Sequence, residues 1–175
     1  MKALYALAVA GLAAGLCLIL IIVLASRDSS QVDPGTASGP GVLESDRGAQ
    51  VITSGPDTPV SAPDAPPTSG NHRDDPINAD RTELTDDQIL TALAAGNVVI
   101  AYDGEAPSGV QEDVSGGYDP ELAAAGQAVI LAKRPGVGGV QALAWRHRLK
   151  ASGPDDPALR EFAEAWLGQG PDSGS

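Results

Sequence analysis

Apolar residues divide the chain into an N-terminal hydrophobic segment, a polar stretch and a patterned C-terminal part. Residues 3–25 carry no charge. As a helix rising about 1.5 Å per residue they would be about 35 Å long, enough to cross a hydrocarbon core of ~30 Å. We therefore predict that residues 1–25 form a transmembrane signal-anchor. A signal peptide cleaved after Ala25 is the alternative, because small residues precede that position, although the apolar runs of signal peptides usually have only about 7–15 residues.

The charges that flank this segment predict its orientation. Lys2 and the α-amino group precede it, whereas Arg27 is offset by Asp28. Positive charge favours the cytoplasmic side of a span, so we expect a cytoplasmic N-terminus, a location in the cell membrane and an extracytoplasmic C-terminal domain. Gly11 and Gly15 form a Gly-x-x-x-Gly pattern that could support weak self-association of two spans, although small residues are common in such segments.

Residues 26–64 are rich in Pro, Gly, Ser, Thr and Asp, with only scattered apolar residues between them. Such a composition cannot bury enough apolar surface to offset the entropy lost on ordering. We therefore predict a disordered linker that tethers a globular domain, residues 65–168, to the membrane. The end of the chain, residues 169–175, is predicted to be a disordered tail.

Three helices are predicted in the C-terminal part, each from its own start signal. Thr85 and Gln88 form a capping-box pattern before an apolar periodic run that Gly96 ends. Two Asp-Pro pairs, which begin at Asp119 and Asp156, repeat a cap-plus-proline signal. The predicted helices cover residues 86–95, 120–126 and 157–167.

Three strands are predicted from apolar patterns. Residues 98–102 are apolar throughout, as expected of a strand inside a sheet, and residues 128–132 form a second apolar strand. Residues 140–150 alternate in polarity and would form a third. Because the turn at residues 134–139 separates the last two strands, we expect them to pair as an antiparallel hairpin. In the third strand, one face would hold Leu143, Trp145, His147 and Leu149, and the opposite, solvated face Arg146, Arg148 and Lys150.

The order helix, strand, helix, strand, strand, helix predicts an α+β fold, or an α/β fold, in which three helices pack on a small mixed sheet. The order is similar to the C-terminal part of a thioredoxin-like topology. About a hundred residues remain once the anchor and the linker are set aside, which is enough for one small domain.

Charge and cysteine content exclude several kinds of function. The formal net charge is −12 at pH 7, and such an acidic surface repels nucleic acid. Cys17, the only cysteine, lies in the predicted anchor. The globular part therefore lacks a disulfide, a Cys-x-x-Cys redox pair and a thiolate metal site.

One motif links the chain to a known family. The run Pro66-Pro67-Thr68-Ser69-Gly70-Asn71-His72, the segment from Leu93 to Tyr102 and the strand around Trp145 carry the likeness. On these residues the chain resembles a family of bacterial extracytoplasmic proteins, the domain-of-unknown-function family number 3105.

The resemblance implies a site that is incomplete in this chain. In that family the helix end reads His-x-Leu-Glu-His-Gly, and its two histidines and glutamate, with the histidine of the first motif, look like a metal or acid–base cluster. This chain keeps His72 but has Thr91, Ala94 and Ala95 at the other three positions. We therefore expect a degenerate site near His72, with no catalytic residue and no cofactor. The candidate ligand-binding residues are Thr68, Ser69, His72 and Tyr102.

Two functions from different classes stay open. The first is a non-catalytic, membrane-tethered module that binds an unknown protein or small molecule near His72, with residues 3–25 in the membrane. The second is a metal-binding protein or metal-dependent enzyme that uses His72 with Asp74, Asp75 or His147.

Overall fold

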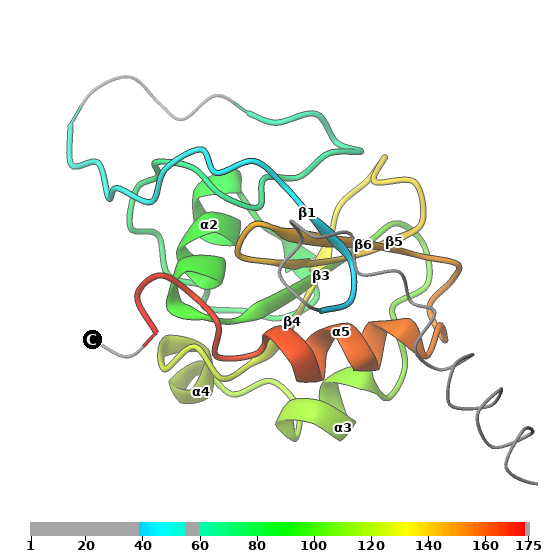
Figure 1. The fold of residues 1–175 in the computed structure, drawn as a ribbon. Coiled ribbons are helices and arrows are strands. Elements are labelled where there is room, and N and C mark those ends of the chain that lie inside the picture. Colours follow the sequence, from blue (N-terminus) through cyan, green and yellow to red (C-terminus); the bar gives the residue numbers. More distant parts are fainter. Residues whose placement is uncertain (1–38, 55–59, 174–175) are drawn as a thin grey trace, which may run out of the picture. The chain divides into compact units, whose positions relative to one another are not determined.

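A computed structural model describes residues 39–54 and 60–173 of the chain. These residues form a mixed α+β fold with a six-stranded mixed sheet and four helices (Figure 1). The predicted α+β class is confirmed. The elements are β1 (Val42–Leu43), β2 (Thr82–Glu83), α2 (Asp86–Ala95), β3 (Val98–Tyr102), α3 (Val110–Ser115), α4 (Pro120–Ala124), β4 (Val129–Lys133), β5 (Val140–Ala144), β6 (His147–Ala151) and α5 (Ala158–Trp166).

β3 lies inside the sheet, as its apolar sequence predicts. The strand order is β1-β6-β5-β3-β4-β2. β3 is parallel to β4 and antiparallel to β5, and β4 is also parallel to β2. Successive side chains of a strand point to opposite faces. All five residues of β3 are buried, because both faces of the sheet are covered.

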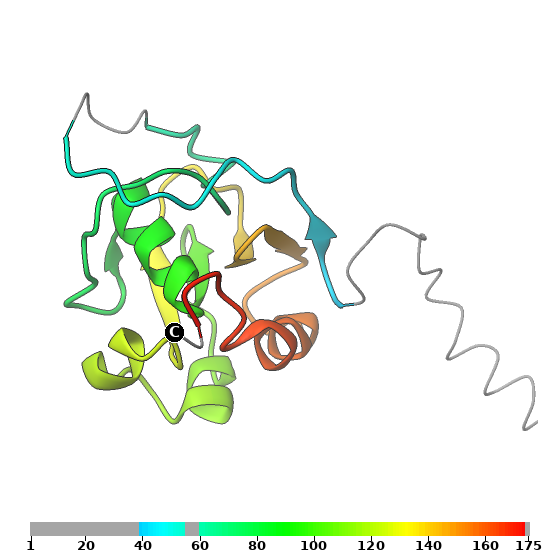
Figure 2. The same ribbon diagram turned by 60° about the vertical axis from the view of Figure 1, so that its left-hand side comes forward.

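Two apolar clusters lie on the two faces of the sheet. The first packs α2 and α4 against one face and includes Leu93 and Val99. The second packs α3 and α5 against the other face and includes Ile100 and Phe162. Figures 1 and 2 show α2 and α5 on opposite sides of the strands. The crossover from β3 to β4 therefore covers one face with α3 and the other with α4.

The three predicted helices are confirmed, and α2 has its predicted bounds. The Thr85 hydroxyl accepts from the N–H of Gln88 at 3.1 Å, the Gln88 side chain accepts from the N–H of Thr85 at 3.0 Å, and Gly96 ends the helix at a φ of 110°. α4 follows the Asp119 cap.

α3 was not expected. It follows Gly109, which provides no side-chain cap, so the sequence lacks a start signal there.

The prediction of one strand over residues 140–150 is wrong, because the chain reverses at Trp145-Arg146 and forms the paired strands β5 and β6. Arg146 adopts a φ of 62°, a left-handed conformation that usually favours glycine. Its N–H donates to the carbonyl of Thr68 at 2.8 Å, and its own carbonyl accepts from the N–H of Glu44 at 2.7 Å. Residues distant in sequence therefore hold a turn that no local residue marks.

This reversal also changes which side chains share a face. Leu143 and Trp145 pack in the cluster beside α2. Leu149 packs in the cluster beside α5, and His147 stacks on Trp166 of that helix. The four residues expected on one face are therefore divided between two.

The expected antiparallel hairpin of the last two predicted strands is also wrong, because β3 lies between β4 and β5. The connecting turn crosses the end of β3. Arg134 N–H donates to the carbonyl of Tyr102 at 2.9 Å, and Asp103 N–H donates to the carbonyl of Gly139 at 3.0 Å. β4 pairs in parallel with β3, which requires a long crossover, and α3 and α4 provide it.

Residues 39–54, called the N-terminal strap below, lie on the domain, although their composition predicted part of a disordered linker. β1 in the strap pairs with β6. The indole N–H of Trp166 donates to the carbonyl of Pro40 at 2.8 Å, and Glu44 pairs with Arg148 at 2.7 Å. Polar interactions hold the strap (Figure 1, cyan), so the apolar pattern did not reveal it. Arg148, expected on a solvated face, is largely buried by the strap, with 11% of its side chain exposed.

Residues 169–173, expected to be disordered, also contact the domain. Gly168 N–H donates to the carbonyl of Gly96 at 2.8 Å, and Asp172 N–H donates to the carbonyl of Ala94 at 3.1 Å. The chain after α5 therefore returns to the C-terminal end of α2 (Figure 2, red).

The predicted membrane span lies outside the described residues, as do Gly11 and Gly15. Within residues 39–54 and 60–173, no helix combines the length and the apolar character that crossing a membrane requires.

Candidate functional site

The N-terminal strap fixes the backbone of His72. The N–H of His72 donates to the carbonyl of Gln50 at 3.1 Å, and its carbonyl accepts from the N–H of Ile52 at 2.8 Å. Its side chain lies almost entirely inside the protein, since the residue is 1% exposed. Nδ1 is 3.0 Å from the carbonyl of Gly70. Because a carbonyl only accepts, Nδ1 carries a proton, and in the neutral ring Nε2 is then an acceptor.

A cleft of about 360 Å³, called the His72 cleft below, opens beside this ring. The strap, the segment that follows His72, and elements α2, α4 and β4 contribute to its walls. Most of the lining is apolar and includes Ile77, Ala94, Ala95, Ala124 and Ile130. Its polar lining residues are His72, Asp74, Asn78, Thr91, Asn97 and Asp172.

The four positions singled out by the family resemblance converge on this cleft. His72, Thr91, Ala94 and Ala95 all line it. Only His72 offers an imidazole, and Thr91 uses its hydroxyl to donate to the carbonyl of Arg73 at 3.0 Å. Among the residues that the structure describes, no group of three or more His, Cys, Asp or Glu side chains could hold a metal ion. These residues therefore do not fit the metal cluster that the resemblance implies.

Asn97 ties the walls of the His72 cleft together, a role that the sequence analysis missed. Its side-chain amide donates to the carbonyls of Ala92 at 3.1 Å and Ala123 at 2.7 Å, and its carbonyl oxygen accepts from the N–H of Ala128 at 2.9 Å. The residue is 2% exposed. One buried side chain thus joins α2, α4 and the start of β4. The sequence offered one signal for this role, because Asn97 is a polar residue between Gly96, which ends a helix, and the apolar strand at residues 98–102.

Thr68 and Ser69 bind the strap rather than the His72 cleft. The hydroxyl of Thr68 donates to Glu44 Oε2 at 2.6 Å. The hydroxyl of Ser69 accepts from the N–H of Arg47 at 3.1 Å and donates to the carbonyl of Ser45 at 3.2 Å. Both residues are 3% exposed, and neither lines the His72 cleft. Their side chains act in this structure as the docking points of the strap.

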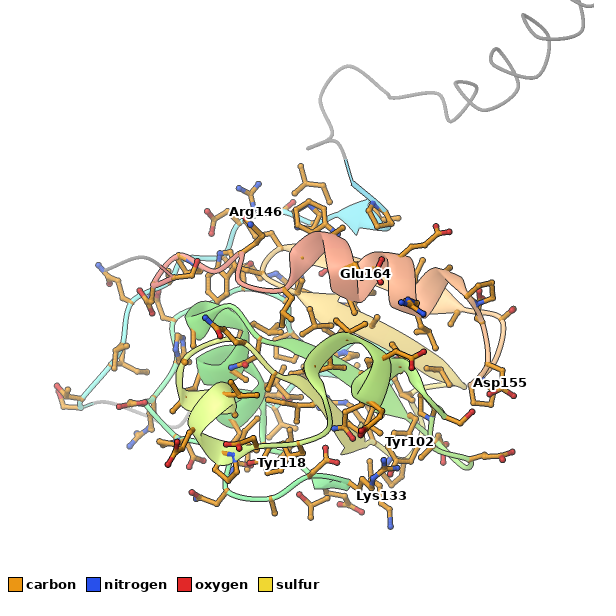
Figure 3. The ribbon with its side chains drawn as sticks, turned by 90° about the horizontal axis from the view of Figure 1, so that it is seen from below. Tyr102, Tyr118, Lys133, Arg146, Asp155 and Glu164 are labelled. Atoms are coloured by element: carbon orange, nitrogen blue, oxygen red, sulfur yellow. The ribbon has the colours of Figure 1, made fainter. Side chains whose placement is uncertain are left out.

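Tyr102 also lies away from the His72 cleft. It is at the C-terminal end of β3, where it pairs in register with Lys133, and Figure 3 shows these two residues together, away from Arg146. Asn97, which lines the cleft, precedes the other end of β3, and a strand rises about 3.3 Å per residue. Of the four candidate ligand-binding residues, only His72 therefore lines this cleft.

A second cleft, of about 460 Å³, lies between the strap and residues 61–68. Its main charged contact is the pair of Arg148 and Glu44, in which the guanidinium donates to both carboxylate oxygens at 2.7 and 3.1 Å. Burial raises the pKa of Glu44, but hydrogen bonds from Arg148 and Thr68 outweigh it and hold that pKa below its ordinary value. The pair neutralises both charges, so it acts as a clamp on the strap.

His147 lies apart from His72. Its ring stacks on Trp166 with the ring centroids 3.6 Å apart, and its Nδ1 is 2.9 Å from the carbonyl of Trp145. Burial lowers the pKa of His147, and the charge of Arg146 adds to that effect. His147 does not line the His72 cleft, whereas Asp74 does.

The fold and the cleft define a small α+β domain with a largely apolar site beside a buried histidine. Residues 54–175 match the family described as "Protein of unknown function (DUF3105)", and the chain belongs to this family. The matched range begins at the end of the strap. No curated protein and no solved structure matched the chain, so the expected thioredoxin-like order stays a prediction.

Proposed function

We propose that this protein is a non-catalytic, membrane-tethered module that binds a small molecule outside the cytoplasm in the His72 cleft. The observation that carries the proposal is the cleft itself, with a volume of about 360 Å³ and a mainly apolar lining that surrounds a few polar groups. Small-molecule sites typically have volumes of about 300–1,000 Å³ and this kind of lining.

The polar groups of the cleft support binding rather than catalysis. His72 is oriented by a backbone carbonyl, whereas a histidine that acts as a base is usually oriented by an acid. Thr91 is the one hydroxyl side chain among the described lining residues. It accepts from the N–H of Asp75 at 3.1 Å and donates to the carbonyl of Arg73, so its oxygen is already engaged.

A screen of small molecules by NMR tests the proposal. The full chain in lipid nanodiscs, labelled on its alanine methyl groups, would be exposed to a fragment library. Ligands should shift the methyl signals of Ala94 and Ala124, which line the cleft from α2 and α4. Ala95→Leu should fill the cleft and abolish these shifts, and Ala124→Leu, at an exposed position, provides a second blocking variant. Shifts that persist in both variants would contradict the proposal.

A metal-binding function is the second candidate, because His72 and Asp74 line the same cleft. An imidazole and a carboxylate are two of the ligands that zinc uses. The metal content of the purified full chain distinguishes the two functions. One equivalent of metal that is lost in His72→Gln and kept in His147→Gln would favour the second candidate, with Asp74→Asn and Asp75→Asn identifying the carboxylate.

A further inference from the structure

The charges and hydrogen-bonding groups of the His72 cleft indicate what kind of ligand it takes. Asp74 and Asp172 line the cleft, and none of its described lining residues is a lysine or an arginine. Asp74 is exposed at the rim. The cleft therefore carries negative charge at its opening and apolar surface within.

The buried ring of His72 provides a second, independent feature. Its Nδ1 lies 3.0 Å from the carbonyl of Gly70 and donates to it, so in the neutral ring Nε2 has the lone pair. Within the described part of the chain, no protein atom forms a hydrogen bond with Nε2, and this nitrogen keeps a small solvent-accessible area. The residue is 1% exposed and lines the cleft, and we place this small accessible surface on the cleft side. A ligand placed there is offered an acceptor.

The remaining polar side chains of the cleft offer few donors. Asn97 uses both its amide nitrogen and its oxygen within the protein, and Thr91 donates its hydroxyl to the carbonyl of Arg73. The exposed Asn78 directs its amide nitrogen to the carbonyl of Pro76 at 3.3 Å. Acceptors and negative charge therefore dominate the surface that a ligand meets.

We infer that the His72 cleft binds an organic cation, a protonated amine with a small apolar body. This inference rests on the proposed function and specifies its ligand class. The ammonium group would donate to Nε2 of His72 or pair with Asp74, while the hydrocarbon part would cover the alanines of α2 and α4. The chain's formal charge of −12 would also attract cations toward the domain.

Three probes with one ring and different head groups test the inference. Cyclohexylamine, cyclohexanol and cyclohexanecarboxylate would be titrated into the full chain in nanodiscs, and the alanine methyl signals would report binding. The Ala95→Leu variant, in which the cleft is filled, would show the effect of probe that only enters the lipid. Partly exposed charge pairs contribute modestly, so we expect the amine to bind about fivefold more tightly than the alcohol, with the carboxylate weakest.

Charge variants test the ligand class independently of whether the site exists. Asp74→Asn should remove most of the amine's advantage over the alcohol. Glu105→Gln removes one negative charge from an exposed residue outside the cleft. This variant should bind the amine and the alcohol as the wild-type chain does. If the three probes bound equally, or the carboxylate bound best, the inferred ligand class would be wrong. The binding site itself would still stand if Ala95→Leu abolished that binding. Identical spectra of the wild-type and blocked chains with all three probes would overturn both.

Discussion

His147 combines a stacked aromatic contact with a buried nitrogen that lacks a partner. Its ring lies on Trp166, and within the described residues Nε2 has no hydrogen-bond partner. Protonation of Nε2 would place a charged donor in this buried position with nothing to accept from it, which is costly. Burial accordingly lowers the pKa of His147 in the folded chain.

We expect the free energy of unfolding to decrease as the pH falls below about 6.5, the ordinary pKa of histidine. Between the lowered folded pKa and the ordinary unfolded pKa, the unfolded chain binds more protons than the folded chain does. The stabilisation by neutral His147 is thus complete above the unfolded pKa and is lost as the pH falls through the folded pKa. Urea denaturation between about pH 5 and pH 8 measures this change.

Matched variants assign this pH dependence to one side chain. His147→Phe keeps a ring on Trp166 without a titrating group, and it should reduce the decrease in stability at low pH. His72→Gln removes the other histidine and should retain most of the decrease. If His147→Phe had the wild-type pH profile, the assignment to His147 would be wrong.

Trp166 joins α5 to the strap, and its removal should be costly. Its ring stacks on His147, and its ring centroid lies 6.5 Å from that of Phe162. Its indole N–H donates to the carbonyl of Pro40. We expect Trp166→Ala to lower the free energy of unfolding by about 3 kcal/mol, the low end of the range for large buried aromatic residues, because Trp166 is half-buried against the core. Trp166→Phe, which loses the hydrogen bond but keeps a ring, should cost about 1 kcal/mol. Equal losses in the two variants would show that the ring packing contributes little.

At the scale of the elements, the parts with local signals were predictable from the sequence. α2 carries a capping box and a terminal glycine, and β3 is an uninterrupted apolar run, so the sequence predicts both. The β5–β6 turn was not predictable, because Arg146 adopts its left-handed conformation beside backbone partners at Thr68 and Glu44. The separation of β4 from β5 was not predictable either, because two apolar strands joined by a short turn usually form a hairpin, and the sequence does not show that β3 lies between them.

The candidate site was predictable only in part. The motif that ends at His72 led to the cleft, and the family resemblance identified the four positions that converge there. Thr68 and Ser69 are candidate ligand-binding residues because their hydroxyls stand beside His72 in the motif, and the sequence does not show that both hydroxyls bind the strap. Their actual partners lie 22 to 24 residues away in sequence. No local pattern of hydrophobic and polar residues reports contacts of that kind.

The strap is predicted to stabilise the domain, although it precedes the range matched by the family. A chain that begins at residue 54 would lose β1 and leave Arg148, whose side chain is 11% exposed, without Glu44. We expect it to be about 3 kcal/mol less stable in urea denaturation than a chain that begins at residue 39, because the pairing of β1 with β6, the Glu44–Arg148 ion pair and several hydrogen bonds to the strap are lost together.

Glu44→Gln in the longer chain isolates the contribution of the ion pair. It keeps the strap and the side-chain shape but removes the negative charge, and we expect a loss of about 1–2 kcal/mol, reduced by the partial exposure of the pair. Equal stability of the chains that begin at residues 39 and 54 would contradict a stabilising role for the strap.

At the scale of the whole molecule, the strap relates the predicted anchor to the proposed binding site. Val51 of the strap lines the His72 cleft and pairs with His72 as a parallel bridge. Residues 26–38 separate the predicted span from the strap. Even fully extended, they could cover only about 45 Å at 3.3–3.6 Å per residue. The number of residues between them therefore sets an upper limit on the distance from the predicted span to the strap.

We predict that the protein stays in the membrane through residues 1–25 with its domain outside the cytoplasm. The segment from residue 3 to residue 25 is uncharged and long enough to span the membrane, and its positive charge precedes it. After expression in a bacterial host, the protein should stay in the membrane pellet through alkaline carbonate washing. Protease added to spheroplasts should degrade the domain, while a cytoplasmic control protein stays intact. Recovery of a soluble extracytoplasmic protein that begins at Ser26 would instead establish cleavage after Ala25, because a cleaved signal peptide would release the domain from the membrane.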